Sequence, residues 1–157
     1  MTLPHVPKAH RYAGTTIWTG AGAGMRGYDD YSREWSFAQS GKPLVRGSAD
    51  VPFRGDATLT NPEDLLLCAL STCHMLSWLA LCARAGIAVQ SYRDDATGTM
   101  SFHAGKMRFT DVLLRPVARL GAGDPMQAIE LHAAAHASCF IASSVNFDVR
   151  HEARIEG

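Results

Sequence analysis

Cys73 and Cys139 are the residues of this sequence best suited to covalent chemistry. Cys73 lies in the middle of the apolar run 65–83, and Cys139 lies at the end of a second predicted helix. A cysteine attacks as the thiolate, and neither position is at a helix N-terminus, where the helix dipole would stabilise that anion. Cys139 is near the negative C-terminal end of its helix, which disfavours ionisation. A reactive thiolate is therefore expected at Cys73, stabilised by a cation from elsewhere in the protein.

The alternative is that Cys73 is inert, because buried cysteines usually pack as small hydrophobic residues. That is the commoner case on residue type alone. Cys68 and Cys82 lie on the same apolar run, and at 100° per residue they point to different faces from Cys73. We expect both of them to pack in the core.

A second kind of chemistry is suggested by His132 and His136, which are four residues apart, with Cys139 three residues further on. The spacing places three potential metal ligands near one face of a helix, and Cys73 is a potential fourth. The pattern is weak, because two histidines at this spacing often occur by chance and no glutamate follows the first, as a metallohydrolase requires. His74 points about 100° away from Cys73 and is not expected in the same site. Metal or small-ligand binding is therefore an alternative function, and no metal or cofactor is assigned.

One long helix is expected to carry Cys73. Asn61 is a suitable N-cap, Pro62 fits the first helical position and Gly86 fits the position just past the end. Between residues 65 and 83 the only titratable side chains besides the cysteines belong to His74. A helix that is apolar nearly all round is buried in a core, in a subunit interface or in a membrane. The polar residues within the run and the absence of a second span argue against the membrane.

The remaining segments predict strands in blocks. We expect strands at residues 9–19, 32–39 and 44–47, a long hairpin formed by 87–102 and 106–119, and a last strand around 147–155. The second helix runs from Asp124 to about Cys139. The glycine-rich residues 20–27 are expected to be a flexible connection, because no phosphate-loop ending follows them. In the second arm of the hairpin the buried face is expected to be Met107, Phe109, Val112 and Leu114, with an irregularity near Asp111.

This order of elements, βββ–α–ββ–α–β without a regular βαβ repeat, predicts an α+β fold in a single domain over residues 1–157. The 15 basic residues balance the 15 acidic ones, so nothing in the charge calls for a nucleic acid or an anionic membrane as partner. No export signal is evident and the four cysteines do not look like a secreted disulfide scaffold. We expect a cytoplasmic protein.

Two motifs resemble the OsmC/Ohr family, the osmotically inducible and organic hydroperoxide resistance proteins. They are NPEDLLLCALSTCHM, which contains Cys73, and HAAAHASCFIASSVNF, which contains Cys139. GSADVPFRGD and RFTDVLLRP resemble the OsmC-like branch in particular. The resemblance covers nearly the whole chain and implies an α+β intertwined homodimer with two active sites at the subunit interface. The sequence departs from the family at Phe140, because a proline often follows the second cysteine.

The resemblance also assigns roles to residues. Cys73 is implied to attack the peroxide and Cys139 to resolve the resulting sulfenic acid, after which a lipoyl protein or a thioredoxin-like dithiol reduces the disulfide. Glu63 is the implied catalytic carboxylate. The implied arginine lies in the loop after the first strand and falls on Arg26, with Arg33 and Arg54 as alternatives. The substrate class implied is the organic hydroperoxide.

Helix geometry adds a hypothesis to these assignments. Glu63 and Cys73 are ten residues apart on one predicted helix, or about 15 Å along its axis. A single arginine does not readily bond both within one chain, so we expect Arg26 and Glu63 to serve Cys73 of the partner subunit. Besides a thiol peroxidase and a ligand-binding protein, a catalytically silent relative with inert cysteines is the third function class.

Overall fold

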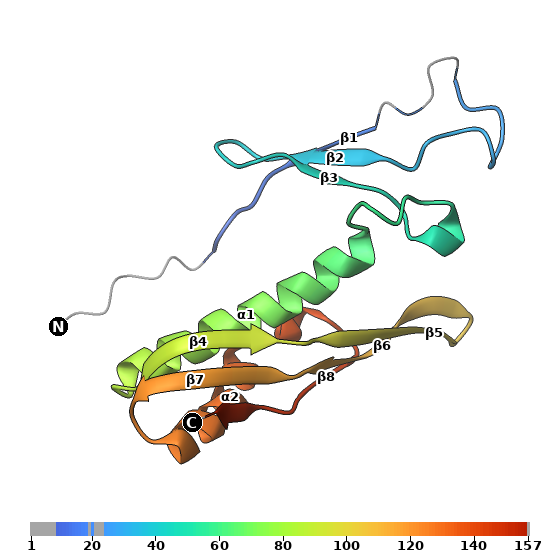
Figure 1. The fold of residues 1–157 in the computed structure, drawn as a ribbon. Coiled ribbons are helices and arrows are strands. Elements are labelled where there is room, and N and C mark those ends of the chain that lie inside the picture. Colours follow the sequence, from blue (N-terminus) through green and yellow to red (C-terminus); the bar gives the residue numbers. More distant parts are fainter. Residues whose placement is uncertain (1–8, 19, 21–23, 157) are drawn as a thin grey trace. The chain divides into compact units, whose positions relative to one another are not determined.

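The computed structural model describes residues 9–18, 20 and 24–156. The chain forms two compact units, one ending at Glu63 and one beginning at Asp64, and each is described here by itself (Figure 1). Mixed helices and strands in blocks confirm the predicted α+β class. The expectation of a single domain over residues 1–157 stays a prediction.

The first unit contains a three-stranded antiparallel sheet in the order β1–β2–β3. Its strands are β1 (Thr15–Ile17), β2 (Trp35–Ala38) and β3 (Val45–Gly47), and the 3-10 helix η1 (Val51–Phe53) follows them. Each strand lies inside a predicted segment but is shorter, since propensity extends beyond the residues that find a partner strand. The predicted connection 20–27 includes residues 21–23, which lie outside the described residues.

Helix α1 (Pro62–Arg84) has the ends that the sequence predicts. Gly86 has a φ of 72°, in the left-handed region that glycine adopts without strain. The N–H of Ile87 donates to the carbonyl of Cys82 at 2.9 Å, and the N–H of Gly86 donates to that of Ala83 at 3.2 Å. These two bonds form a Schellman motif, which satisfies carbonyls at the helix end.

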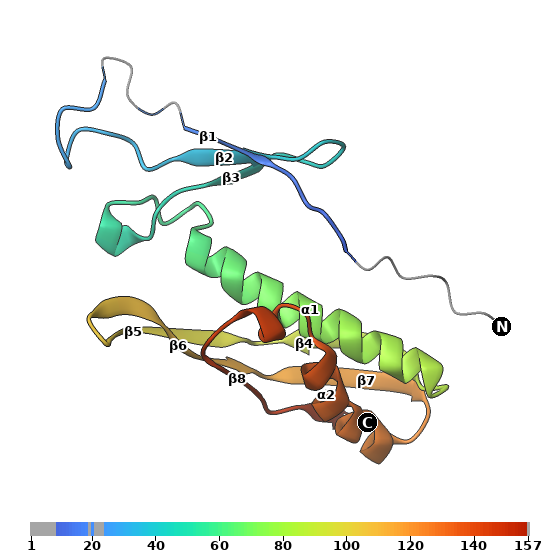
Figure 2. The same ribbon diagram turned by 180° about the vertical axis from the view of Figure 1, so that it is seen from behind.

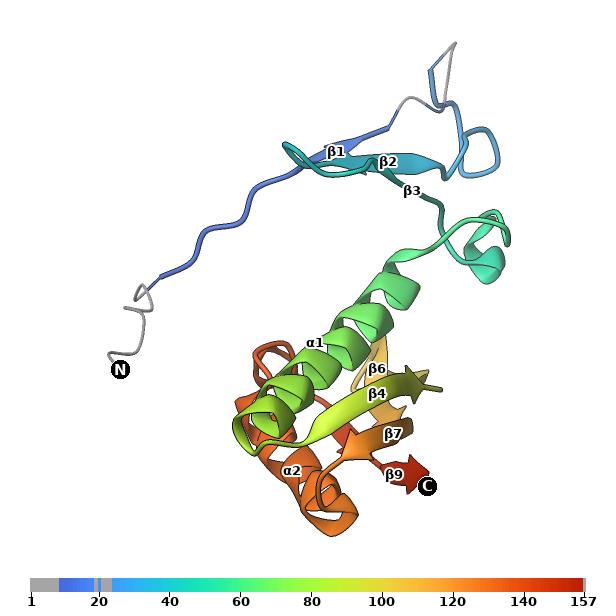
Figure 3. The same cartoon turned by 60° about the vertical axis from the view of Figure 1, so that its left-hand side comes forward.

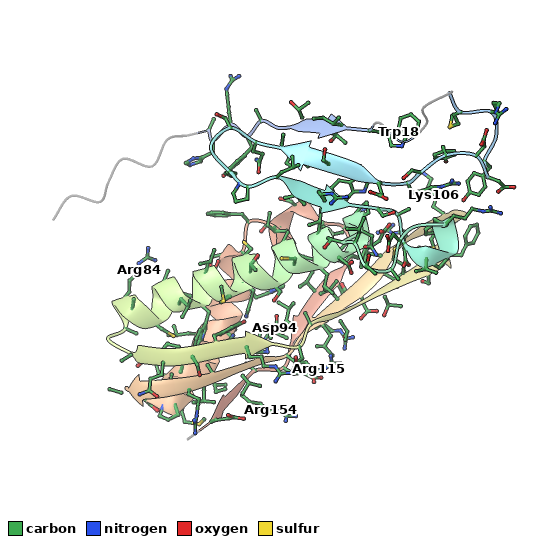
Figure 4. All side chains as sticks on the ribbon, turned by 45° about the horizontal axis from the view of Figure 1, so that its top comes forward. Trp18, Arg84, Asp94, Lys106, Arg115 and Arg154 are labelled. Atoms are coloured by element: carbon green, nitrogen blue, oxygen red, sulfur yellow. The ribbon has the colours of Figure 1, made fainter. Side chains whose placement is uncertain are left out.

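The long hairpin forms as predicted but is interrupted in the middle, which divides it between two three-stranded sheets. The strands are β4 (Ala88–Asp94), β5 (Thr97–His103), β6 (Lys106–Leu114) and β7 (Pro116–Ala122). β5 pairs with β6 and β4 pairs with β7, both antiparallel. At the break, the N–H of Arg115 donates to the Asp94 carboxylate at 2.6 Å, and Ser71 of α1 donates to the same carboxylate at 2.5 Å. Asp94 and Arg115 lie close together at this point in Figure 4, so one carboxylate fastens α1 to the interrupted hairpin.

The predicted irregularity near Asp111 is present as a bulge. Thr99 pairs with Asp111 and Met100 pairs with Phe109, so one residue of β6 has no partner in the register. The predicted last strand is two strands, β8 (Asp148–His151) and β9 (Arg154–Glu156). β8 runs parallel to β6 and β9 runs parallel to β7, which gives the sheet orders β5–β6–β8 and β4–β7–β9. The last strand is therefore interrupted where the hairpin is.

Helix α2 (Pro125–Ser138) begins after Asp124, whose side chain accepts the N–H of Met126 at 2.9 Å. α1 and α2 cover the same face of the sheets (Figures 2 and 3). Two groups of buried side chains fill the space between them: Trp78, Cys82, Ile87, Ala118, Ala128 and Ala135 in one, and Leu70, Val112 and Leu114 in the other. The core of the second unit therefore lies between this helical layer and the sheets.

Two expectations about burial are wrong. Met107 is exposed and lies next to the hairpin turn at residues 104–105, while Val112 and Leu114 are buried as expected. Cys68 is exposed, whereas Cys82 is fully buried. Periodicity along α1 identifies its faces but does not say which of them meets the sheet.

By length and composition, α1 is the one helix of the described chain that could cross a membrane, with a mean hydropathy of 1.8 over its most apolar window. Its buried side chains are Leu70, His74, Trp78 and Cys82, and three of them belong to the two core groups. One face of α1 is therefore buried in the core of the second unit.

Candidate active site

The second unit brings the two predicted redox cysteines together. Cys73 is on the middle of α1, and Cys139 directly follows the last residue of α2. The side chains of Cys73 and Cys139 are close enough for Cys73 to raise the pKa of Cys139, and both are free thiols in this structure. Cys139 is buried and Cys73 is half-buried, so a reactant from solvent has its access at Cys73.

The surroundings of Cys139 keep its thiol protonated. Burial is the main cause that raises the pKa of Cys139, and its contact with Cys73 raises it further. The N–H groups of Ala142 and Ile141 lower it, the former donating to Sγ at 3.5 Å, but they do not reverse the direction. Ionisation of Cys139 is disfavoured, as the sequence predicts, although the dominant cause is burial and not the helix end.

Cys139 is also held firmly by its backbone. Its N–H donates to the carbonyl of His136 at 3.2 Å, which closes the end of α2. Its own carbonyl accepts the N–H and the hydroxyl of Ser143, both at 3.0 Å. These bonds connect α2 to the 3-10 helix η2 (Ala142–Ser144) and fix the position from which the Cys139 sulfur faces Cys73.

A cluster of four histidines lies beside the cysteine-bearing segments, and the sequence did not predict it. It consists of His74 from α1, His132 and His136 from α2, and His151 from β8. His74 Nε2 and His132 Nδ1 are hydrogen-bonded at 2.9 Å, and their rings stack with 14° between the planes. The signal in the sequence was the four-residue spacing of His74 and Trp78, which places both on the buried face of α1.

The buried histidines are uncharged at neutral pH. Burial lowers the pKa of His74 to about 4, and the neighbouring rings of His151 and His136 add to the effect. Burial also lowers the pKa of His132 to about 3, with His74 and His151 as further causes. Trp78 stacks on His132 with ring centroids 4.7 Å apart, so the cluster is continuous with the aromatic core.

The alternative metal site does not assemble in the described part of the chain. No group of three or more His, Cys, Asp or Glu side chains among those residues could hold a metal ion. His132 Nδ1 is occupied by His74, and the ring of His132 stacks on Trp78. The spacing of His132, His136 and Cys139 thus places the two histidines in the ring cluster and Cys139 against Cys73.

The predicted arginine, Arg26, lies in the first unit. Its Nε donates to the carboxylate of Asp30 at 2.9 Å, and its side chain is 80% exposed. Together with Met25, Tyr28 and Tyr31 it borders an open hollow of about 370 Å³. An exposed ion pair of this kind contributes little to stability, so the Arg26 guanidinium is available to exchange partners.

The two alternative arginines have more binding partners than Arg26. The guanidinium of Arg33 lies over the rings of Tyr31 and Tyr28, at 3.7 Å and 4.7 Å from their centroids, and donates to both of their backbone carbonyls. Arg54 has a left-handed φ of 64° and forms an ion pair with Asp29 at 2.6 Å. Such contacts indicate that Arg33 organises its own loop.

Glu63 is the second residue of α1 and the last residue of the first unit. The helix is continuous from Pro62 to Arg84, so Glu63 and Cys73 keep the ten-residue helical separation on which the two-subunit hypothesis depends. The roles of Arg26 and Glu63 stay predictions.

Comparison with known proteins identifies relatives over most of the chain. Residues 55–154 match the family described as OsmC-like protein. An OsmC-like protein of unknown function from Vibrio cholerae has 31% identity and a TM-score of 0.83, over 92% of this chain and 99% of that one. An uncharacterised protein of Bacillus subtilis, YmaD, is 24% identical over 75% of this chain and 83% of its own length. An organic hydroperoxide resistance protein OsmC from Legionella pneumophila shares the fold, with 15% identity and a TM-score of 0.64 over 95% of this chain and all of that one.

Proposed function

Because this chain belongs to the OsmC-like protein family, we propose that it is a thiol-dependent peroxidase that reduces organic hydroperoxides to alcohols. The observation that carries the proposal is the proximity of the Cys73 and Cys139 side chains. The Legionella relative is named as an organic hydroperoxide resistance protein, and we extend that substrate class to this chain.

In the first step the Cys73 thiolate attacks the terminal oxygen of the hydroperoxide. The O–O bond breaks, the alkoxide takes up a proton and leaves as the alcohol, and Cys73 becomes a sulfenic acid. In the second step the Cys139 sulfur attacks that sulfenic acid, and a disulfide and one water molecule form. An external dithiol then reduces the disulfide and is itself oxidised. The division of roles is consistent with burial, because the half-buried Cys73 meets the substrate and the buried Cys139 meets only Cys73.

The Cys73 thiolate needs a cation, since it lies in mid-helix and gains nothing from a helix N-terminus. We propose that Arg26 supplies the cation and that Glu63 orients it. Glu63 is about 15 Å from Cys73 along α1, so an arginine that bonds Glu63 does not readily reach Cys73 of the same chain. The proposal therefore includes a homodimer in which Arg26 and Glu63 serve Cys73 of the partner subunit.

The same chemistry suggests the cellular compartment and the reductant of the protein. Each turnover leaves a disulfide that only a dithiol can remove, and reduced dithiol carriers are maintained in the cytoplasm. We propose a cytoplasmic enzyme that is reduced by a lipoyl protein or a thioredoxin-like protein, without a metal or an organic cofactor.

Cysteine variants test the proposal directly. Reduced protein is mixed with one equivalent of cumene hydroperoxide, the remaining peroxide is measured, and disulfides are mapped by mass spectrometry. We expect one equivalent of peroxide to be consumed and a Cys73–Cys139 bridge to form. Cys139→Ser should still consume peroxide and stop at a sulfenic acid that dimedone traps, whereas Cys73→Ser should consume none.

Cys68→Ser is the matched control, because Cys68 is an exposed thiol on the same helix as Cys73. It should behave as the wild type. Four unreacted thiols in the wild type would identify a catalytically silent relative and would end the peroxidase proposal. Peroxide consumption that survives Cys73→Ser would also end it.

A further inference from the structure

The histidine cluster is the largest group of titratable side chains that the proposed reaction does not use. His74 and His132 are 1% and 0% exposed; His74 is on α1, which carries Cys73, and His132 is on α2, which Cys139 directly follows. Histidines are rarely retained fully buried without a partner, and here the partner of each is the other. The arrangement therefore calls for an explanation beyond core packing.

The bond between the two rings is a hydrogen bond between neutral partners. One ring nitrogen donates and the other accepts, so the 2.9 Å contact requires at least the accepting ring to be uncharged. Burial lowers the pKa of both rings well below 7, so at neutral pH both partners are uncharged. The rings that contact this pair are His151 from β8 and Trp78 from α1. Behind them, His136 from α2 contacts His151, and Tyr92 contacts Trp78. The ion pairs of the described residues join arginines to aspartates or a glutamate and include none of these histidines.

The position of the bond in the two helices relates it to the cysteines. His74 directly follows Cys73 on α1, and His132 lies two helical turns before Cys139 on α2. The apolar contacts between these helices are non-directional and tolerate small sliding movements. A hydrogen bond is directional and fixes the register of one helix against the other. Trp78 Nε1, which donates to the carbonyl of Ala128 at 2.8 Å, acts at the same interface but further from the cysteines.

Register matters at this place because a disulfide has narrow geometric limits. Two cysteines can be bridged only when their Cα atoms are within about 7 Å and their Cβ atoms point towards each other. A slide of α2 along α1 by a fraction of a helical turn would carry the Cys139 sulfur out of that range.

We infer that the His74–His132 hydrogen bond is a latch between α1 and α2 that holds Cys73 and Cys139 in position to form their disulfide. His74 and His132 are thus positioning residues for the cysteine pair and do not touch the peroxide. The inference rests on the proposed function only in so far as it treats Cys73 and Cys139 as a dithiol that forms a disulfide.

The test measures the disulfide equilibrium without any peroxide. Full-length protein carrying Cys68→Ser, which removes the exposed thiol, is equilibrated with mixtures of reduced and oxidised glutathione. One oxidised glutathione and the two protein thiols give two reduced glutathiones and the protein disulfide, so the equilibrium constant is the effective concentration of Cys73 and Cys139. The readout is a potential, which a loss of stability alone does not move.

The decisive variant is the double substitution His74→Leu with His132→Phe. It removes both hydrogen-bonding partners at once and leaves no unpaired buried nitrogen, so the loss of stability should be small. The phenyl ring keeps the stack on Trp78. We expect the effective concentration to fall about tenfold, the equilibrium value of one neutral hydrogen bond. In the single variant His132→Asn, the side-chain amide lies near the former position of Nδ1 and can hydrogen-bond to His74. This variant should therefore keep most of the effective concentration that the double variant loses.

Three outcomes separate the inference from the proposed function. An unchanged effective concentration in a folded double variant would overturn the latch and leave the peroxidase untouched. A wild-type protein that forms the bridge with glutathione but reduces no hydroperoxide would remove the proposed function and leave the latch. If the wild type forms no Cys73–Cys139 bridge with glutathione, both are overturned.

Discussion

The free energy of unfolding should fall steeply between pH 7.5 and pH 5, because two buried histidines must stay uncharged in the folded protein. The pKa of His74 is lowered to about 4 and that of His132 to about 3, from an ordinary value of 6.5. In the unfolded chain both histidines take up a proton as the pH falls through 6.5. In the folded protein they do not, so acid favours the unfolded state.

The magnitude follows from the separation of the two pKa values. One pKa unit corresponds to about 1.4 kcal/mol, and pH 5 is 1.5 units below the unfolded value while still above both folded values. Each histidine therefore removes about 2 kcal/mol of stability at pH 5 relative to neutral pH, or about 4 kcal/mol for the pair. The pKa of His151 is lowered too, which adds in the same direction. Because a domain of this size is stable by only about 5–15 kcal/mol, the effect is large.

The assay is urea unfolding, followed by far-UV circular dichroism, at several pH values between 7.5 and 5. The free energy of unfolding should be at its full value well above pH 6.5 and should decrease progressively as the pH falls below 6.5. His74→Leu with His132→Phe is the matched variant, and its free energy of unfolding should change much less over the same range. Equal wild-type stability at pH 7.5 and pH 5 would refute the reasoning, and so would the same pH dependence in the double variant, because the titration would then belong to other groups.

Three further predictions concern single residues. Asp94→Asn should lower the free energy of unfolding by about 1–3 kcal/mol, because the carboxylate accepts bonds from α1 and from the hairpin break; the exposed Asp95→Asn should change it by less than about 0.5 kcal/mol in the same urea titration. Gly86→Ala should cost about 1 kcal/mol, measured as a lower urea midpoint, since alanine is strained at a φ of 72°. Arg26→Gln should slow stoichiometric cumene hydroperoxide consumption at least about tenfold with an unchanged melting temperature; a greater loss in Arg54→Gln would move the proposed role to that arginine.

Features that depend on neighbours in the sequence were determined by the sequence itself. Pro62 and Gly86 determine where α1 begins and ends, and Asp124 determines where α2 begins, because capping residues act within a single helical turn. The bulge beside Asp111 and the order of helices and strands could likewise be predicted from the sequence. The family could be identified as well, because each cysteine motif is a contiguous stretch of sequence. These signals are local, so no knowledge of the packing was needed to interpret them.

The tertiary structure alone decided which distant residues meet. His74 and His132 are 58 residues apart, and only the packing of both helices on one face of the sheets brings His74 Nε2 within 2.9 Å of His132 Nδ1. The same packing faces Cys139 towards Cys73, buries Cys82, and leaves Cys68 and Met107 exposed. The period of a helix or strand defines its faces, but the face that becomes buried depends on the partner that covers it.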